Sequence, residues 1–473
     1  MRSATQFITA MIGVSVGLAT LLVVSGPAMG QQIKLDVSLS APIDSSPKYN
    51  AIADWNPEAQ SACLYSANEL QAPATSSEPW VKPGNCINWV PPSGTLPGIY
   101  DATWDSGKSH ALLVISDAPR KPSHSSIAVI VPDYTWQAYD LVKGGSFYFE
   151  AVGKKSTEFS MRKLNLLRPL NFVRVGDPKN YPTTPQVFPE VNPINFLRRH
   201  FGEVDVIAQS KLDEANYDLS AYRTIVVYGH DEYWTAKVKS DIETAVANGT
   251  ALLNLSGNTG YRKLVRTGLV LGFDPASAAH PSTSRWGDKA GDTTPIPLIG
   301  AEYLGEPFNK RKSVPIQVSE RTFRGLTRDG LPANLTRKDV ATYLEGMKVR
   351  HGEDPLFADT GLRNGDFLGV NSHVMSVEVD AIPEDASGKI EPDFTKKFGT
   401  APISAAADVW VNARKDRGNL AWRAGTLIRT QFGRGKVFTA GPIGWTASLV
   451  DGDRLIRIVT LNAMRWLGQV PVR

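Results

Sequence analysis

Residues Thr224–Trp234 read TIVVYGHDEYW, and this stretch decides the fold. Its first five residues form an apolar run rich in β-branched side chains, which is typical of a buried parallel strand. The residues from Thr235 to Asn248 mix charged and apolar side chains and end at Gly249, which predicts a helix. A histidine, two carboxylates and two aromatic rings thus follow a strand at its carboxyl end, where open α/β sheets place ligand sites.

Outward from this stretch, short apolar runs alternate with amphipathic segments. This alternation predicts a parallel sheet with helices on both faces. The further strands are expected at Ile127–Val131, Val204–Ala208, Ala251–Leu255 and Gly435–Gly441, and further helices at Asn195–Phe201 and Leu455–Leu467.

Four regions are expected along the chain. Residues 1–30 form an export signal, and residues 31–120 a β-rich region with strands near Cys86–Val90 and Ala111–Ile115. After a linker, residues 126–473 form the α/β domain, interrupted at about 275–420 by a proline-rich insertion with mixed patterning. A chain of this length, 42% hydrophobic, can bury large cores.

The first residues have the pattern of a secretory signal peptide. Arg2 supplies a positive charge, Phe7–Val24 is uncharged and mostly apolar, and Ala28–Gly30 offers small residues before a cut at Gln31. This predicts a periplasmic or secreted protein without a membrane span after cleavage. The alternative is an uncleaved membrane anchor, since the apolar stretch is near the length that spans a bilayer.

The net charge bears on which partners the chain can bind, and the two cysteines bear on whether it contains a disulfide. The net charge is +4 and no basic tract is present, so nothing indicates nucleic acid. Cys63 and Cys86 are the two cysteines of the chain. In an exported protein such a pair predicts a disulfide, which would stabilise the fold by roughly 3 kcal/mol. Neither has neighbours at metal-ligand spacing.

Several motifs together resemble the N,N-dimethylformamidase large-subunit family over most of residues 95–470. The most specific is the order of two blocks, Thr135–Tyr139 (TWQAY) and then Gly229–Trp234 (GHDEYW) about 90 residues later. The others are Pro97–Tyr100, Gly144–Ser146, Ser256–Asn258 with Tyr261, and Gly433–Gly441 with Trp445.

This resemblance implies a flavodoxin-like core similar to class I glutamine amidotransferases. It also implies one ferric ion (Fe3+) per chain, held by two tyrosines and a glutamate beside a histidine. Carried over residue by residue, Glu232, Tyr139 and Tyr100 become the metal ligands and His230 the catalytic histidine. Pro97 stands where the family has a serine before the first tyrosine, so Tyr148 is the alternative to Tyr100.

The residue types agree with this chemistry. Carboxylate and phenolate oxygens are hard donors that suit a hard cation, and a metal with open positions acidifies bound water and polarises a carbonyl. A histidine can take a proton from that water and give it to the leaving amine. His230 and Glu232 are two positions apart, so at a strand end both face one pocket while Asp231 faces away. Asp231 is expected to cap the following helix.

Structural roles are the alternative for each of these residues. A histidine at a strand end often has only a structural role, and Tyr100 alone would be a packing residue. Asn258, Tyr261 and Arg262 follow a strand, where they either line the substrate pocket or form a turn. Trp136 is expected as an apolar wall for substrate, whereas Arg285 and Trp286 lie either at substrate or on a surface loop.

The sequence supports three alternative hypotheses about function. The first is an exported, iron-dependent hydrolase of a linear amide, with a small subunit or a second copy of the chain as partner. The second is a non-catalytic α/β module of the cell envelope that binds carbohydrate, motivated by export and eleven tryptophans. The third is a hydrolase of an envelope sugar derivative, because fold alone does not decide function. No serine-hydrolase elbow or nucleotide-binding glycine motif follows a strand.

Overall fold

The computed structural model describes residues 38–39, 62–64, 87–89, 95–104, 109–117, 126–139, 147, 163–165, 192–268, 270–273, 285–286, 293–303, 347–349, 351–369, 372, 374, 379–381, 404–412, 421–423, 427–450 and 452–472. The signal segment, Tyr148 and Cys86 lie outside them, so export, cleavage and the Cys63–Cys86 pairing stay predictions.

The centre of the molecule is a sheet whose first half is parallel, as the sequence predicted. Its strands are β6 (Ile127–Val131), β8 (Asp205–Ala208), β9 (Thr224–His230), β11 (Ala251–Gly257) and β21 (Gly435–Ala440). They lie side by side in the order β8-β6-β9-β11-β21, all parallel. Numbered along the chain, the spatial order is second, first, third, fourth, fifth.

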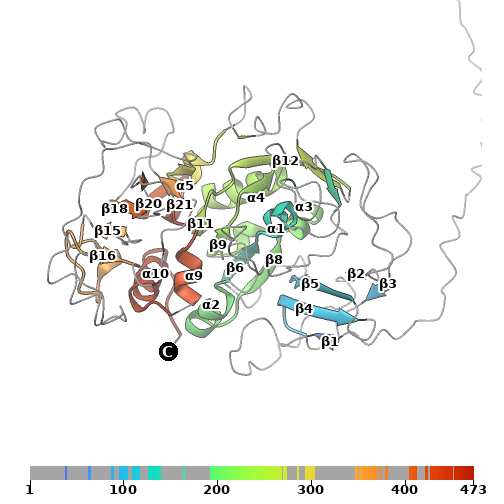
Figure 1. The fold of residues 1–473 in the computed structure, drawn as a ribbon, viewed down its shortest axis with the longest axis horizontal. Coiled ribbons are helices and arrows are strands. Elements are labelled where there is room, and N and C mark those ends of the chain that lie inside the picture. Colours follow the sequence, from blue (N-terminus) through green and yellow to red (C-terminus); the bar gives the residue numbers. More distant parts are fainter. Residues whose placement is uncertain are drawn as a thin grey trace, which may run out of the picture.

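Helices cover both faces of these strands (Figure 1). On one face lie α1 (Asp133–Tyr139), α3 (Gln209–Glu214) and α4 (Ala236–Ala247), and on the other α2 (Ile194–Phe201), α9 (Trp445–Val450) and α10 (Arg454–Trp466). The predicted helices near 195–201, 235–248 and 455–467 are α2, α4 and α10.

Side chains alternate between two cores along each parallel strand, because successive residues of a strand point to opposite faces. Val129, Val226 and Leu253 pack with α2, α9 and α10. Their neighbours Ile130, Val227 and Leu252 pack with α3 and α4. Each such side chain, removed fully from water, contributes about 1.5–3 kcal/mol. Burial on both faces explains why these strands are apolar without alternation.

The second half of the sheet is antiparallel and was not predicted. Here β20 (Leu427–Phe432) follows β21, and β18 (Ser404–Asn412), β15 (Met347–Val349) and β16 (Phe367–Leu368) continue outward, with β19 (Ala421–Arg423) on β18. Within the insertion at 275–420, β15, β16 and β18 therefore extend the central sheet, whereas β14 and β17 pair with each other. The shorter elements of this region are α5 (Ile296–Ile299), β14 (Glu302–Tyr303), β17 (Asp380–Ala381) and a 3-10 helix at Pro355–Phe357.

A second, four-stranded sheet lies beside α4 in the order β10-β12-β13-β7. Its strands are β10 (Tyr233–Thr235), β12 (Arg262–Thr267), β13 (Val270–Phe273) and β7 (Lys163–Asn165). Because β10 follows β9 after two residues, and β12 follows β11 after four, the small sheet starts where the parallel strands end.

Short strands precede the parallel sheet. β4 (Gly98–Trp104) and β5 (Ser109–Ile115) form a hairpin that β1 (Ser38–Leu39) extends, and β2 (Ala62–Leu64) pairs with β3 (Ile87–Trp89). Apart from residues 95–97, 116 and 117, the rest of residues 31–120 lies outside the described residues, so a wholly β-rich region stays a prediction.

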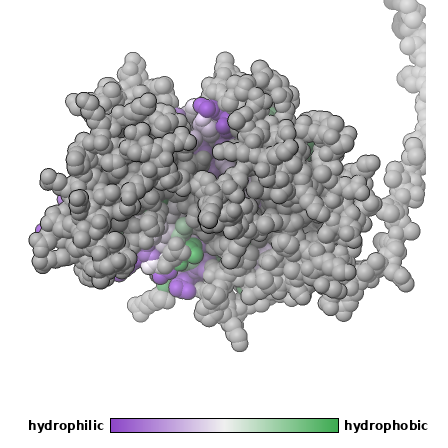
Figure 2. All heavy atoms as spheres, in the orientation of Figure 1, coloured by the Kyte–Doolittle hydropathy of each residue, from purple (hydrophilic) through white to green (hydrophobic). Residues whose placement is uncertain are grey.

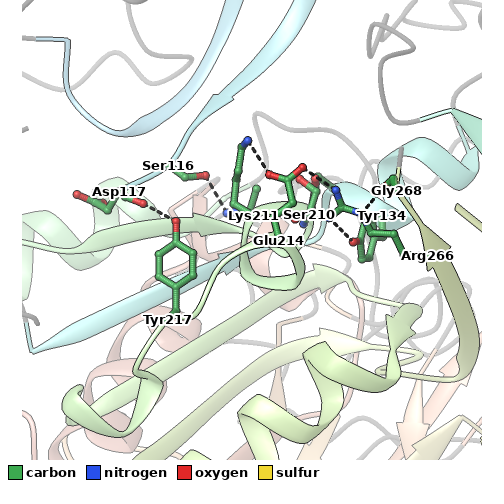
Figure 3. Close-up of polar contacts among 11 residues, drawn as sticks. Ser116, Asp117, Tyr134, Ser210, Lys211, Glu214, Tyr217, Arg266 and Gly268 are labelled. Carbon is green, nitrogen blue, oxygen red and sulfur yellow. Dashed lines mark hydrogen bonds and ion pairs between the residues drawn. The ribbon is translucent and has the colours of Figure 1, made fainter. Parts of the chain in front are cut away.

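The end of this hairpin binds β8, the last strand of the central sheet. Asp117 donates its backbone N–H to the carbonyl of Val206 at 2.7 Å, and its carboxylate accepts the Val206 N–H at 2.7 Å. Ser116 Oγ accepts the Ala208 N–H at 3.0 Å. Tyr217 Oη donates to the Asp117 carbonyl at 2.6 Å (Figure 3). Two side chains thus satisfy backbone donors that a further strand would otherwise take.

Candidate functional site

The end of β9 is shaped by a glycine and by bonds from three neighbouring elements. Gly229 has φ of +68°, a conformation that glycine adopts without steric cost. Its N–H donates to Thr446 Oγ1 at 3.3 Å, and the Asp231 N–H donates to Ser256 Oγ at 3.1 Å. Thr135 Oγ1 accepts the Glu232 N–H at 3.0 Å. These bonds fix the direction of His230 and Glu232.

His230 and Glu232 point to the same side, and Tyr139 from the end of α1 meets them there. Tyr139 Oη donates to Glu232 Oε2 at 2.8 Å, and His230 Nε2 lies 3.3 Å from the same oxygen. The Tyr139 and His230 ring centroids are 5.0 Å apart. The side chains of His230 and Glu232 are 2% and 3% exposed. The structure thus brings three of the predicted site residues together.

Asn258, which follows β11, and Arg262, the first residue of β12, complete this group. Asn258 has φ of +56°, and its Nδ2 lies 3.3 Å from His230 Nε2. Arg262 Nε lies 3.4 Å from Glu232 Oε1. We name Tyr139, His230, Glu232, Asn258 and Arg262 the histidine cluster. It gathers an imidazole, a carboxylate, a phenol, an amide and a guanidinium at the carboxyl edge of the parallel strands.

Asp231 faces away from the cluster, as its position between His230 and Glu232 predicted. Its Oδ1 accepts from Gln209 Nε2 at 2.7 Å. Burial raises the pKa of this carboxyl to about 7, although the bond from Gln209 acts in the opposite direction. The expected helix cap was wrong: Thr235 caps α4, its Oγ1 accepting the Val238 N–H at 3.2 Å.

The other predicted residues take varied places. Tyr100 is buried on β4, and its hydroxyl donates to the Leu96 carbonyl at 2.6 Å. Burial raises the pKa of its phenol, an effect that nearby Arg198 opposes. Trp136 is 1% exposed and packs in the core formed with α2, α9 and α10. Tyr261 is half-buried, its ring 4.9 Å from the Arg262 guanidinium carbon. Metal or substrate binding by these three residues stays a prediction.

Two of the three predicted metal ligands lie together and suit a hard cation. Tyr139 and Glu232 supply a phenol and a carboxylate oxygen within hydrogen-bond distance of each other, and such oxygens favour hard ions. The Tyr100 hydroxyl donates instead to the Leu96 carbonyl. No group of three or more His, Cys, Asp or Glu side chains in this described part could hold a metal ion.

Sequence reasoning missed the residues that orient the site. Thr135 accepts both the Glu232 N–H and, at 3.3 Å, the Tyr233 N–H. Thr446 accepts from Gly229 and donates to the Leu255 carbonyl at 3.0 Å, so it joins β9 to β11. The signal for Thr135 was its place as the first residue of TWQAY, just after a strand. Thr446 follows β21 in the same way.

A second polar group lies on the same side of the sheet, between α1, α3 and β12 (Figure 3). Tyr134 Oη donates to Asp213 Oδ2 at 2.8 Å. Arg266 donates to the Ser210 carbonyl at 2.5 Å and to Glu214 Oε1 at 2.6 Å. We name these five residues, together with Asp133, the arginine cluster. Asp133 accepts the Ser210 N–H at 3.1 Å, and burial raises the pKa of its carboxyl to about 6.

On the face drawn in Figure 2, the described side chains at the top are hydrophilic, whereas those at the lower edge are of both kinds. Figure 2 shows apolar and hydrophilic side chains side by side at the lower edge of this face, where α2, α9 and the C-terminal end lie in Figure 1. The exposed large apolar residues include Val450, the last residue of α9, and Val470 and Val472, which follow α10. Among the described residues no helix is both long enough and apolar enough to cross a bilayer.

Comparison with known proteins gives one clear match. The family described as N,N-dimethylformamidase beta subunit-like, C-terminal, matches residues 51–455. No curated protein matches the chain.

Solved structures give only distant similarity. A beta-galactosidase from Bacillus circulans sp. alkalophilus is 12% identical, with 73% of this chain and 32% of that chain covered and a TM-score of 0.32. A GH42 beta-galactosidase from G. stearothermophilus is 12% identical, with 74% and 31% covered and the same TM-score of 0.32. This chain therefore spans about a third of the length of each.

Proposed function

Because this chain belongs to the N,N-dimethylformamidase beta subunit-like family, we propose that it hydrolyses the carbon–nitrogen bond of linear amides. One observation carries the proposal: His230, Glu232, Tyr139 and Asn258 meet at the carboxyl edge of the parallel strands. The same edge is where α/β sheets of this kind bind their ligands. The family match and the residue cluster both support the proposal.

His230 is the residue that moves the proton. Its Nε2 lies 3.3 Å from an amide donor, Asn258 Nδ2, and 3.3 Å from an acceptor, Glu232 Oε2. The neutral nitrogen can accept from Asn258, and the protonated nitrogen can donate to Glu232. Both protonation states therefore have a partner, which suits a group that first takes a proton from water and then gives it to the leaving amine.

Tyr139 and Glu232 are the proposed holders of a ferric ion, with Tyr100 or Tyr148 as third ligand. The Tyr139–Glu232 contact of 2.8 Å and the hard character of both oxygens support this assignment. When bound, such an ion polarises a carbonyl and acidifies water. Glu232 Oε1 faces Arg262 at 3.4 Å, which leaves Oε2 as the oxygen shared with Tyr139 and His230.

We propose a flavodoxin-like core similar to class I glutamine amidotransferases. Its support is the spatial order of the parallel strands, second, first, third, fourth, fifth, which is the flavodoxin order. The proposal also includes export to the periplasm or medium, a Cys63–Cys86 disulfide, and assembly with a small subunit or a second copy. The word "subunit" in the family description supports assembly.

The test joins activity to metal content. Purified protein is incubated with N,N-dimethylformamide and other linear amides while amine release is measured. His230→Gln should lower kcat by about 10²- to 10⁴-fold, the usual contribution of general acid–base catalysis. His351→Gln is the matched control, because the side chain of His351 is 55% exposed.

Elemental analysis should find iron in the wild type and little in Glu232→Ala. Hydrolysis that survives both metal removal and His230→Ala would contradict the proposal. A metal-free protein that hydrolyses no amide and binds glycans would favour the non-catalytic envelope module.

A further inference from the structure

The turn that carries Asn258 has an uncommon backbone conformation. Asn258 has φ of +56° and Gly260 has φ of +58°, so left-handed residues lie on both sides of Thr259. A Cβ added at Gly260 would lie 3.0 Å from a ring carbon of Trp234, so the turn is also closely packed. Residues in sparsely populated conformations persist where the surrounding structure holds them. The bonds that hold this turn therefore bear on where the Asn258 amide lies.

Thr259, at the centre of the turn, is held through its side chain by β11. Its buried hydroxyl accepts from Asn254 Nδ2 at 3.3 Å and lies 3.5 Å from Asn254 Oδ1. Asn254 is fully buried between Leu253 and Leu255, where an amide costs free energy unless it is hydrogen-bonded. Its Oδ1 also accepts the Ser256 N–H at 3.1 Å. A polar side chain in an apolar strand is thus used to fix the residues that follow the strand.

The backbone of the turn is bonded to two further segments. The Thr259 N–H donates to Oδ2 of Asp380, a buried residue of the insertion, at 3.0 Å. The N–H of Asp380 in turn donates at 2.9 Å to the carbonyl of Gly441, just after β21. The Gly260 N–H donates to the Asp231 carbonyl at 2.8 Å. Besides its bond to β11, the turn is therefore tied to the ends of β21 and β9.

These bonds bear on the proposed reaction because Asn258 Nδ2 lies 3.3 Å from His230 Nε2. A displacement of about 1 Å at a reaction site can cost on the order of 10²-fold in rate. We propose that Thr259 is a positioning residue, which keeps the Asn258 amide against His230 Nε2. It does so through its bonds to Asn254 and Asp380. This inference rests on the proposed amide hydrolysis and adds a residue that acts on it through Asn258.

The experiment removes the Thr259 hydroxyl and keeps a side chain of similar size. Thr259→Val should lower kcat/KM for N,N-dimethylformamide about three- to tenfold, the rate equivalent of one neutral hydrogen bond. Thr259→Ser, which keeps the hydroxyl, should restore most of this rate. Thr250→Val is the matched control, because Thr250 is buried at the other end of β11 and its hydroxyl donates to the Tyr222 carbonyl at 3.1 Å. It should lower the midpoint of thermal unfolding to a similar extent but keep the rate within about twofold.

A double-mutant cycle with Asn258→Gly distinguishes positioning from a general structural role. If Thr259 acts through Asn258, Thr259→Val should lower the rate by less than about twofold once residue 258 is changed. Full additivity of the two losses, or the wild-type rate in Thr259→Val, would overturn the inference.

Amide hydrogen exchange, followed by mass spectrometry, measures the hold on the turn without any substrate. In Thr259→Val the amides of residues 258–260 should exchange at least about threefold faster than in the wild type, and in Thr250→Val at the wild-type rate. A wild type that hydrolyses no amide would reject the proposed function, and unchanged exchange in Thr259→Val would then reject the hold on Asn258 as well. Hydrolysis by the wild type with unchanged exchange and additive losses would keep the hydrolase and reject the positioning role.

Discussion

The histidine cluster and the arginine cluster use the same kinds of residue on the same side of the sheet. Each takes a tyrosine from α1, Tyr139 or Tyr134, and an arginine from β12, Arg262 or Arg266. Each also contains a carboxylate that accepts from the tyrosine, Glu232 at 2.8 Å or Asp213 at 2.8 Å. The shared tyrosine, arginine and carboxylate do not tell the two groups apart, and the histidine cluster differs by adding His230 and Asn258.

The difference lies in how the groups are connected. In the arginine cluster the hydrogen bonds join neighbouring elements: Tyr134 and Thr235 both donate to Asp213, and Arg266 joins β12 to α3. In the histidine cluster one atom, His230 Nε2, lies near both a donor and an acceptor. The first arrangement stabilises packing, whereas the second is the one that we propose moves a proton. Under this proposal, the way the groups are connected separates a structural cluster from a reactive one.

The sharpest test exchanges the two tyrosines for phenylalanine. Tyr139→Phe should lower kcat/KM for an amide substrate by about 10²- to 10³-fold, the usual cost of losing one oriented donor at a reaction site. Tyr134→Phe should leave the rate within about twofold but reduce the free energy of unfolding by about 1–3 kcal/mol, because Asp213 loses a buried donor. Steady-state kinetics and urea unfolding measure the two effects. If both variants lost activity equally, the distinction between the clusters would be wrong.

The second test concerns the pH dependence of stability. The carboxyl of Asp133 has its pKa raised from 3.8 to about 6 by burial. Between these values the folded protein keeps a proton that the unfolded chain releases, so the free energy of unfolding falls as pH rises from about 4 to 6. The fall is at most about 3 kcal/mol, at about 1.4 kcal/mol per pKa unit.

Asp133→Asn cannot ionise and its amide oxygen can still accept from Ser210. It should match the wild type near pH 4 and be more stable at pH 7 by up to about 3 kcal/mol, as urea unfolding at both pH values would show. Asp218→Asn, at an exposed position, is the control. A variant that is less stable than the wild type at pH 7 would mean that ionised Asp133 is well compensated.

Two variants of Asn258 distinguish a requirement for its backbone conformation from a requirement for its side-chain amide. Asn258→Gly keeps the freedom to adopt a φ of +56° and should leave stability almost unchanged, while amide hydrolysis falls about tenfold because His230 loses its donor. Asn258→Ala should show the same loss of rate and also lose about 1 kcal/mol of stability through strain. Thermal unfolding beside kinetics distinguishes the two variants, and full activity in Asn258→Gly would remove Asn258 from the mechanism.

The smallest effect is expected at the rim of the arginine cluster. The side chain of Glu214 is 38% exposed and bridges Lys211 and Arg266. Solvent screens such pairs, so Glu214→Gln should change the free energy of unfolding by less than about 0.5 kcal/mol and leave hydrolysis unaffected. A loss above 2 kcal/mol would show that this bridge holds α3 against β12 more firmly than its exposure suggests.

The sequence predicted the parallel strands well because each is buried on both faces. Ile127–Val131 and Thr224–Tyr228 could be recognised from their continuous apolar runs alone. The common direction of His230 and Glu232 followed from the two-residue repeat of an extended strand. The contact of His230 with Asn258 depends on the pairing of β9 with β11, in which His230 lies opposite Gly257.

The antiparallel strands could not be predicted because they are short and distant in sequence. Met347–Val349 has three residues and pairs with Ser404–Asn412, more than fifty residues away. Three residues show no periodicity, and only tertiary pairing makes them a strand. Likewise, Thr135 supports Glu232 across 97 positions. No local pattern indicates a bond over such a distance.

The bonds of Ser116 and Asp117 to β8 have a consequence for the behaviour of the protein in solution. An uncovered outer strand is a template on which a strand of another molecule can add, and this is a common route to aggregation. Here two side chains occupy the N–H groups of Val206 and Ala208 that an incoming strand would use. The end of the hairpin thus covers this part of the β8 edge and should hinder the addition of another strand there.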